Sequence, residues 1–339
     1  MDIEGESHNL SEEASGHSDD EEYASAPKIT LSSLTEANRE ESTIPVLKQW
    51  SYTGARKVIP SALADTFCAD LGVDGVLEKL NTTLGTSYAL DSVISILDSY
   101  IARNDDFGTA YAYLRRYWSD IPTIEHELRT LEEKDREMRR NAIVDGRITN
   151  RDVPPRRVWD LYANRVVPYW VARKYLWGIS HAWVDDENRV DVMTPINGYE
   201  WPVPIPKDAN LDLIRIEMLN AQSRYTLHTA EYAWLDVLCL RQEGGKDEAL
   251  RVEEWKLDVP TIGSMYALAP NVVCYFNGLG QPLDLTLSDF ESDRCWFRRA
   301  WTLQEVTYHP IIGGEMVQDV MEKEVRRKFD EQLTSLQEI

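Results

Sequence analysis

Four polar residues interrupt or end apolar segments, and their side chains are the first candidates for chemistry. They are Ser180, His181, Asp236 and Glu305. Ser180 and His181 lie toward the end of the first expected strand, Asp236 lies inside the second, and Glu305 closes the helix that follows the last. Because ligands of parallel sheets bind at the carboxyl ends of the strands, we expect a site there. A carboxylate can stabilise a positively charged transition state, and a histidine can act as a base.

Each of these residues also has a structural explanation. Asp236 must be paired or hydrogen-bonded, since an unpartnered charge in a buried strand would protonate or destabilise the fold. Its partner could be a backbone group or an arginine that only shapes the end of the sheet. His181 could be a satisfied structural histidine, and Glu305 could be an exposed helix residue. The residue types alone leave these alternatives open.

Strands alternate with helices from Lys174 onward, which predicts an α/β fold with a parallel sheet covered on both faces. The expected strands are residues 175–184, 232–240 and 272–276, with a hairpin at 192–205 around Asn197-Gly198. The expected helices are residues 211–224, 251–269, 296–305 and 315–339. Pro260 either kinks the second helix or begins a new one.

The chain before Lys174 differs in composition and in its pattern of apolar residues. Residues 1–45 contain twelve acidic residues and two basic ones, so we expect a disordered acidic tail. Residues 44–171 have helical patterning and few strand signals; the charged helix at 121–142 has one apolar stripe. The predicted organisation is therefore an acidic tail (1–45), a helical region (46–171), an α/β domain (172–315) and a C-terminal helix (316–339).

Composition excludes several classes of protein. The net charge of −22 argues against a nucleic-acid partner, because phosphate binding needs a basic face. No run approaches ~18 apolar residues and the N-terminus does not resemble a secretory signal, so we expect a cytoplasmic protein without a membrane span. The four cysteines are too widely spaced for a zinc or disulfide framework; we expect reduced thiols and no bound metal.

Three blocks are unusually specific in their aromatic and charged content. They are Ile179–Asp185 (ISHAWVD), Tyr232–Gln242 (YAWLDVLCLRQ) and Arg294–Glu305 (RCWFRRAWTLQE). Together they resemble the HET domain of fungal heterokaryon-incompatibility proteins, whose usual pattern is Trp-Ile-Asp-x-Leu-Cys-Ile-x-Gln followed by Arg-Ala-Trp-Thr-Leu-Gln-Glu. The first block departs from the commoner Leu-Ser-Tyr-x-Trp-Gly, most clearly at His181.

HET domains are similar to the Toll/interleukin-1 receptor (TIR) domain, a flavodoxin-like parallel sheet that in many members cleaves NAD⁺ between nicotinamide and ribose. Enzymatic TIR domains have a Trp followed four residues later by the catalytic Glu, a spacing that Trp301 and Glu305 share. The resemblance therefore implies a possible NAD⁺ glycohydrolase (NADase) with Glu305 as catalytic carboxylate, NAD⁺ as substrate and no cofactor. The residues that it implies in binding the substrate or organising the site are Ser180, His181, Asp185, Asp236 and Trp301.

The resemblance further implies a fungal effector of programmed cell death that acts after self-association and responds to an incompatibility partner protein. The alternative function is a non-enzymatic signalling module that recruits partners through the same domain. Eleven tryptophans fit either core packing or interface anchors, so composition does not separate the two.

Overall fold

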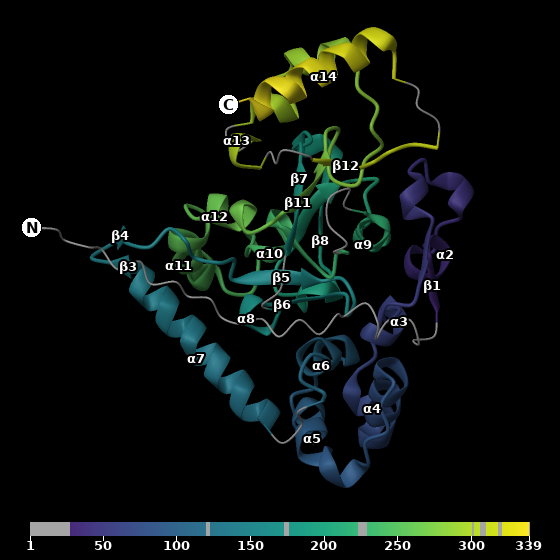
Figure 1. Ribbon diagram of the computed structural model, residues 1–339, viewed down its shortest axis with the longest axis vertical. Helices are drawn as coiled ribbons and strands as arrows, with labels where there is room; N and C mark the ends of the chain where they lie inside the picture. The colour runs from purple at the N-terminus through teal and green to yellow at the C-terminus, as the bar shows by residue number, and fades with distance from the viewer. Residues whose placement is uncertain are drawn as a thin grey trace, which may run out of the picture.

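A six-stranded mixed sheet lies at the centre of the computed structural model, flanked by helices (Figure 1). The structure describes residues 28–119, 123–172, 176–222, 229–299, 302–305, 310–317 and 321–338. The strand order is β12-β11-β7-β10-β5-β6. The strands are β5 (Arg157–Asp160), β6 (Arg165–Pro168), β7 (Leu176–His181), β10 (Tyr232–Leu235), β11 (Asn271–Tyr275) and β12 (Ile311–Ile312).

Four of these strands are parallel to one another: β7, β10 and β11 lie where strands were predicted, whereas β12 was not predicted. β7 pairs with β10 on one side and β11 on the other, and β12 pairs with β11. Every residue of β7, β10 and β11 is buried, as expected for strands covered on both faces. Because the chain passes from β7 to β10 and then returns to the opposite side for β11, the sheet changes its direction of winding at β7. Ligands of such sheets bind at the carboxyl ends of the strands at this point.

The sheet also contains an antiparallel hairpin that the sequence analysis did not predict. β5 pairs with β10 and β6 pairs with β5, both antiparallel. The expectation that strands begin only near Lys174 is therefore wrong. Polar residues obscured the pattern: Asp160, Asn164 and Arg165 are all buried and find partners elsewhere in the fold. The division at residue 172 stays a prediction, although it separates β6 from β7 within one sheet.

Helices cover the sheet on both sides, with α9 on one side and α11 and α12 on the other (Figure 1). The helices before β5, the first strand of the six-stranded sheet, are α2 (Ser33–Ala37), α3 (Ser61–Ala64), α4 (Cys68–Leu84), α5 (Ile94–Ala102), α6 (Phe107–Leu114) and α7 (Ile124–Ala142). Those that follow are α8 (Tyr169–Ala172), α9 (Leu211–Asn220), α10 (Asp236–Cys239), α11 (Glu248–Asp258), α12 (Ile262–Ala267), α13 (Thr302–Glu305) and α14 (Lys323–Gln337). None of the described helices is long and apolar enough to cross a membrane.

Three smaller sheets have two strands each. They are β1 (Ile29–Ser32) with β2 (Ser51–Gly54), β3 (Ile143–Val144) with β4 (Arg147–Ile148), and β8 (Arg189–Val192) with β9 (Val203–Pro206). The β8–β9 pair confirms that a hairpin forms here, but the predicted Asn197-Gly198 turn is wrong: residues 193–202 connect the strands, Asn197 ends a 3-10 helix (Pro195–Asn197), and of the two residues Gly198 alone has a positive φ, 66°. In the region predicted as one helix, 251–269, the structure has two separate helices, α11 and α12, and Pro260 lies between them.

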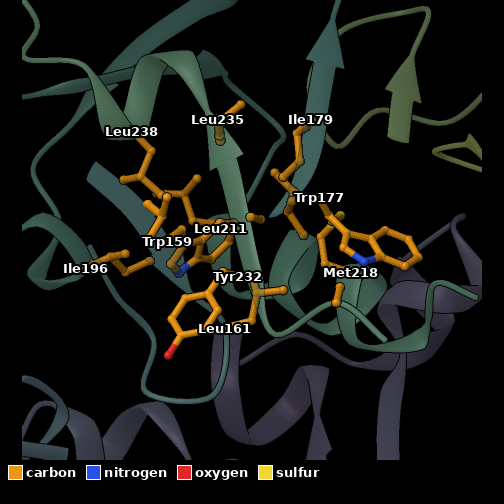
Figure 2. Close-up of a cluster of buried hydrophobic side chains, with 14 of the residues drawn as sticks. Trp159, Leu161, Trp177, Ile179, Ile196, Leu211, Met218, Tyr232, Leu235 and Leu238 are labelled. Atoms are coloured by element: carbon orange, nitrogen blue, oxygen red, sulfur yellow. The ribbon is translucent and has the colours of Figure 1, made fainter. Parts of the chain in front are cut away.

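The core of the sheet joins elements from both halves of the chain (Figure 2). Trp159 of β5, Trp177 of β7 and Tyr232 of β10 are buried together with Met218 of α9. Burying a large aromatic or aliphatic side chain contributes about 1.5–3 kcal/mol, so this shared core couples the hairpin of β5 and β6 to the parallel strands.

Residues 28–45 correct the prediction that all of residues 1–45 form a disordered tail. β1 pairs with β2, and Leu31 and Ile44 are buried. Glu36 Oε2 accepts hydrogen bonds from the Ser61 backbone N–H at 2.8 Å and the Ser61 hydroxyl at 2.6 Å. The prediction for residues 1–27 lies outside the described residues.

Two truncations test how much this segment contributes. Removal of residues 1–27 should leave the free energy of unfolding unchanged within about 0.5 kcal/mol. Removal of residues 1–45 should lower it by at least about 3 kcal/mol, because Leu31 and Ile44 leave the core. Urea unfolding followed by circular dichroism measures both values. Equal midpoints for the two truncated chains would contradict a structural role for residues 28–45.

An aromatic cluster anchors the segment that follows β11. Phe276, Phe290, Trp296, Phe297 and Phe329 contact one another, with ring centroids 4.7 to 5.8 Å apart. Phe329 comes from α14, the helix observed where a longer one, 315–339, was predicted. The cluster fixes Trp296 against the end of the sheet, where the candidate site lies.

Candidate functional site

A hydrogen bond between Ser180 and Glu305 forms the centre of the candidate site. Ser180 lies near the end of β7, and its hydroxyl donates to Glu305 Oε2 at 2.5 Å across 125 residues of sequence. The Ser180 oxygen in turn accepts from the Trp296 indole N–H at 2.7 Å. Ser180 is 1% exposed and Glu305 is 3% exposed, so the alternative of an exposed helix residue is wrong for Glu305.

Arg299 neutralises the buried Glu305 carboxylate. Its two terminal nitrogens donate to the two carboxylate oxygens, Nη1 to Oε2 at 3.0 Å and Nη2 to Oε1 at 3.1 Å. This forked geometry is the strong form of an arginine–carboxylate contact.

The helix predicted from Trp296 to Glu305 is not continuous. A 3-10 turn (Trp296–Arg298) is followed by extended backbone at Arg299.

His181 and Asp236 form a second pair at the same end of the sheet. His181 Nε2 lies 2.9 Å from Asp236 Oδ1, and its Nδ1 lies 3.2 Å from the Ala182 carbonyl oxygen. Asp236 also accepts from the Val237 N–H at 2.8 Å. The strand expected at 232–240 is shorter than predicted, because β10 ends at Leu235 and Asp236 begins α10. The side chain of Asp236 remains 23% exposed and reaches solvent.

Electrostatics connects the two pairs. Burial alone would raise the pKa of Asp236, but the charge and hydrogen bond of His181, together with the charge of Arg299, hold this pKa below its ordinary value. Burial, and then the charges of Glu305 and Asp236, raise the pKa of Tyr266 well above its ordinary value. Arg299 and Tyr266 thus lie within the electrostatic influence of both carboxylates.

The geometry argues against a serine hydrolase. Successive side chains of a strand point to opposite faces, so Ser180 and His181 diverge. The Ser180 hydroxyl donates to Glu305, and both ring nitrogens of His181 contact other groups. A serine nucleophile needs a base that accepts its proton and is itself oriented by a third group. These contacts instead describe a serine that orients a carboxylate.

Two predicted site residues are not placed with the others. Asp185 forms an ion pair with Arg294, and both side chains are more than half exposed. No contact joins this pair to Glu305 or Asp236 in the described part of the chain. Trp301 lies outside the described residues, so its role in the site remains a prediction.

Arg299, Trp296 and Tyr266 are site residues that the sequence analysis did not assign. A signal was available for Arg299, because a buried carboxylate requires a cationic partner or several donors, and two arginines precede Glu305 within seven residues. No comparable signal indicates Tyr266, whose hydroxyl donates to the Ile179 carbonyl at 3.2 Å. That contact depends on how α12 packs on β7.

The cysteines offer no alternative nucleophile. Cys68, Cys239, Cys274 and Cys295 are buried and unpaired, which confirms the predicted free thiols. Burial raises the pKa of Cys239 to about 12, so its thiol stays protonated at neutral pH. Within the described ranges, no group of three or more His, Cys, Asp or Glu side chains could hold a metal ion.

Comparison of the chain with protein-family models finds no match, and neither curated proteins nor solved structures give a significant match. The resemblance of the three sequence blocks to HET and TIR domains therefore remains an expectation. Function has to be argued from the geometry at the end of the sheet.

Replacing Asp236 tests the second pair. Asp236→Ala should lower the free energy of unfolding at neutral pH by about 1–3 kcal/mol, because His181 and the Val237 N–H lose their acceptor. A carboxylate whose pKa is lowered by folding stabilises the protein above its unfolded pKa, near 4, and this contribution is lost as the pH falls through the folded value. Asp236→Asn removes the same charge, so the difference in unfolding free energy between this variant and wild type should shrink below about pH 4. Urea unfolding at pH 7 and pH 3 measures it, and an equal deficit at both pH values would contradict an ion pair.

Proposed function

We propose that this chain is a TIR-like HET domain protein that hydrolyses NAD⁺ at the bond between nicotinamide and ribose. The observation that carries the proposal is the contact of Ser180 with Glu305 at the switch point of the sheet. It supports the expectation, drawn from the family resemblance, that Glu305 is the catalytic carboxylate. A cytoplasmic effector of fungal cell death is the corresponding biological role.

The strand order supports the TIR-like part of the proposal. Numbered along the chain, the parallel strands β7, β10, β11 and β12 stand in the order 2-1-3-4. Flavodoxin-like sheets have this order and bind their ligands between the first and third strands. Ser180 lies one residue before the end of the first of these strands, and Glu305 follows the third.

The reaction makes modest demands on the protein. The nicotinamide ring of NAD⁺ carries a positive charge and leaves as a neutral molecule, so no general acid is needed. As the bond from ribose C1′ to nitrogen breaks, positive charge develops on the ribose, and a carboxylate beside it stabilises the transition state. Water then forms the new bond to C1′ and releases a proton. Glu305 would hold the ribose hydroxyls, and Ser180 would orient its carboxylate.

The burial of Glu305 favours the second candidate function, a non-enzymatic signalling module. Both carboxylate oxygens are already bonded within the protein, and the side chain is nearly inaccessible. A carboxylate in this state binds no ribose until its partners move. Self-association that rearranges the segment around Arg299 would reconcile the burial with catalysis; association without that change would leave a recruitment module.

Nicotinamide release by the purified full-length chain separates the two functions. Specific activity should rise with protein concentration, because the site opens on association. The rise should be steeper at moderate than at low salt, since the net charge of −22 opposes contact and ~0.15 M salt limits the range of repulsion to about 8 Å. NADH is the matched control, because its uncharged ring is a poor leaving group. Absence of nicotinamide at every concentration, with association seen by sedimentation, would support the recruitment module instead.

A further inference from the structure

Arg299 is paired with Glu305, one of the two carboxylates of the site. Its guanidinium is forked onto Glu305, and Nη1 also lies 3.5 Å from the Ser180 hydroxyl. Its charge reaches Asp236, which is paired with His181 on the other side. The side chain is only 12% exposed. The cation therefore fills the space that a ligand of Glu305 would need.

The backbone at Arg299 allows this cation to leave without unwinding a helix. Arg299 lies between the 3-10 turn Trp296–Arg298 and α13, with extended backbone at φ −67° and ψ 143°. The neighbouring contacts do not depend on its side chain: Trp296 is fixed by the aromatic cluster, and the Thr302 hydroxyl donates to the Trp296 carbonyl at 2.6 Å. Withdrawal of the guanidinium breaks the contacts with Glu305 and Ser180 and leaves these anchors in place.

The site left by Arg299 would suit a planar cation, and the nicotinamide ring of NAD⁺ is such a cation. Without Arg299, the Glu305 carboxylate lacks the cation that balances its charge. A guanidinium is a planar, delocalised and weakly hydrated cation. The nicotinamide ring of NAD⁺ is also a planar, delocalised cation. One can therefore replace the other as the planar cation beside the Glu305 carboxylate.

We propose that Arg299 is an internal occupant of the subsite for the cationic nicotinamide ring, and that the structure is the closed state of the site. This inference rests on the proposed function and adds its regulation: the substrate, or association of subunits, must displace Arg299 before Glu305 can act. Arg299 is thus an autoinhibitory residue and not a catalytic one.

Binding of 1-methylnicotinamide tests the subsite apart from catalysis. This probe has the cationic ring but carries a methyl group in place of ribose, so it cannot be cleaved. Calorimetric titration should show that Arg299→Gln binds it at least about tenfold more tightly than wild type, a change of about 1.4 kcal/mol. Uncharged nicotinamide should gain no comparable affinity. Arg298→Gln is the matched control, because Arg298 is exposed and donates to the Glu291 carbonyl away from the site.

The double variant Arg299→Gln/Glu305→Gln should lose the gain, because the carboxylate that attracts the ring is gone. If Arg299→Gln does not fold, Arg299→Lys replaces the fork by a single point of contact and should bind the probe more tightly than wild type. Equal affinity of wild type and the folded Arg299 variant would overturn the inference. Tighter binding of the probe without nicotinamide release from NAD⁺ would instead support the subsite and count against the proposed catalysis.

Discussion

Glu305→Gln is expected to reduce nicotinamide release by at least about 100-fold, the scale of losing one preorganised electrostatic contact in a transition state. The variant should also lose about 3 kcal/mol of unfolding free energy, because the buried Arg299 loses its ionised partner. A glutamate exposed in a cleft would tolerate the exchange within about 0.5 kcal/mol, so the stability measurement tests the observed burial independently. Chromatography of nicotinamide and urea unfolding provide the two values.

Glu291→Gln is the matched control for this experiment. Glu291 is an exposed glutamate of the same connecting segment. Its exchange should change neither quantity beyond error. Circular dichroism at the assay temperature shows whether Glu305→Gln is folded when its activity is measured. Wild-type turnover in that folded variant would remove Glu305 from the reaction.

Asp160→Ala is expected to lower the free energy of unfolding by about 4 kcal/mol, the largest loss of stability among these substitutions. The side chain of Asp160 is fully buried, and its Oδ2 forms an ion pair with Arg115. Oδ1 accepts the backbone N–H groups of Tyr162 at 2.9 Å and Ala163 at 3.0 Å. The substitution leaves an arginine and two backbone donors without this acceptor. Asp74→Ala, at an exposed position of α4, should cost less than about 0.5 kcal/mol.

The same experiment tests the predicted division at residue 172. Arg115 follows α6, Asp160 ends β5, and Glu231, 2.6 Å from Arg115, precedes β10. This network joins the predicted helical region to the sheet. Unfolding of Asp160→Ala should therefore remain one transition at a lower urea concentration, with coincident fluorescence and circular dichroism. Two separate transitions would show that the regions unfold independently.

Apolar runs explain which parts of the fold could be predicted. β7 and β11 are buried along their whole length, and their sequences show it. The hairpin of β5 and β6 could not be predicted in the same way, because Asp160 and Arg165 interrupt it with charges. Each charge is tolerated only because an ion-pair partner from the helical region, at least 45 residues away, is folded against it. Short-range patterning contains no information about such pairs.

The candidate site was predicted in part for the same reason. Ser180, His181, Asp236 and Glu305 were chosen as polar residues near strand ends, and the structure brings them together in two pairs, Ser180 with Glu305 and His181 with Asp236. Position near a strand end does not ensure this, since Asp185 projects into an exposed ion pair. Arg299 was overlooked because arginines in a charged segment are usually exposed, whereas this side chain is 12% exposed and paired with Glu305.

Product analysis of NAD⁺ incubated with concentrated wild-type protein identifies the bond that is broken. Liquid chromatography with mass detection separates nicotinamide, ADP-ribose, nicotinamide mononucleotide and AMP. If Glu305 catalyses cleavage between nicotinamide and ribose, we expect nicotinamide and ADP-ribose in equal amounts from wild type and neither from folded Glu305→Gln. Intact NAD⁺ under conditions where the protein associates, or nicotinamide mononucleotide with AMP, would contradict it.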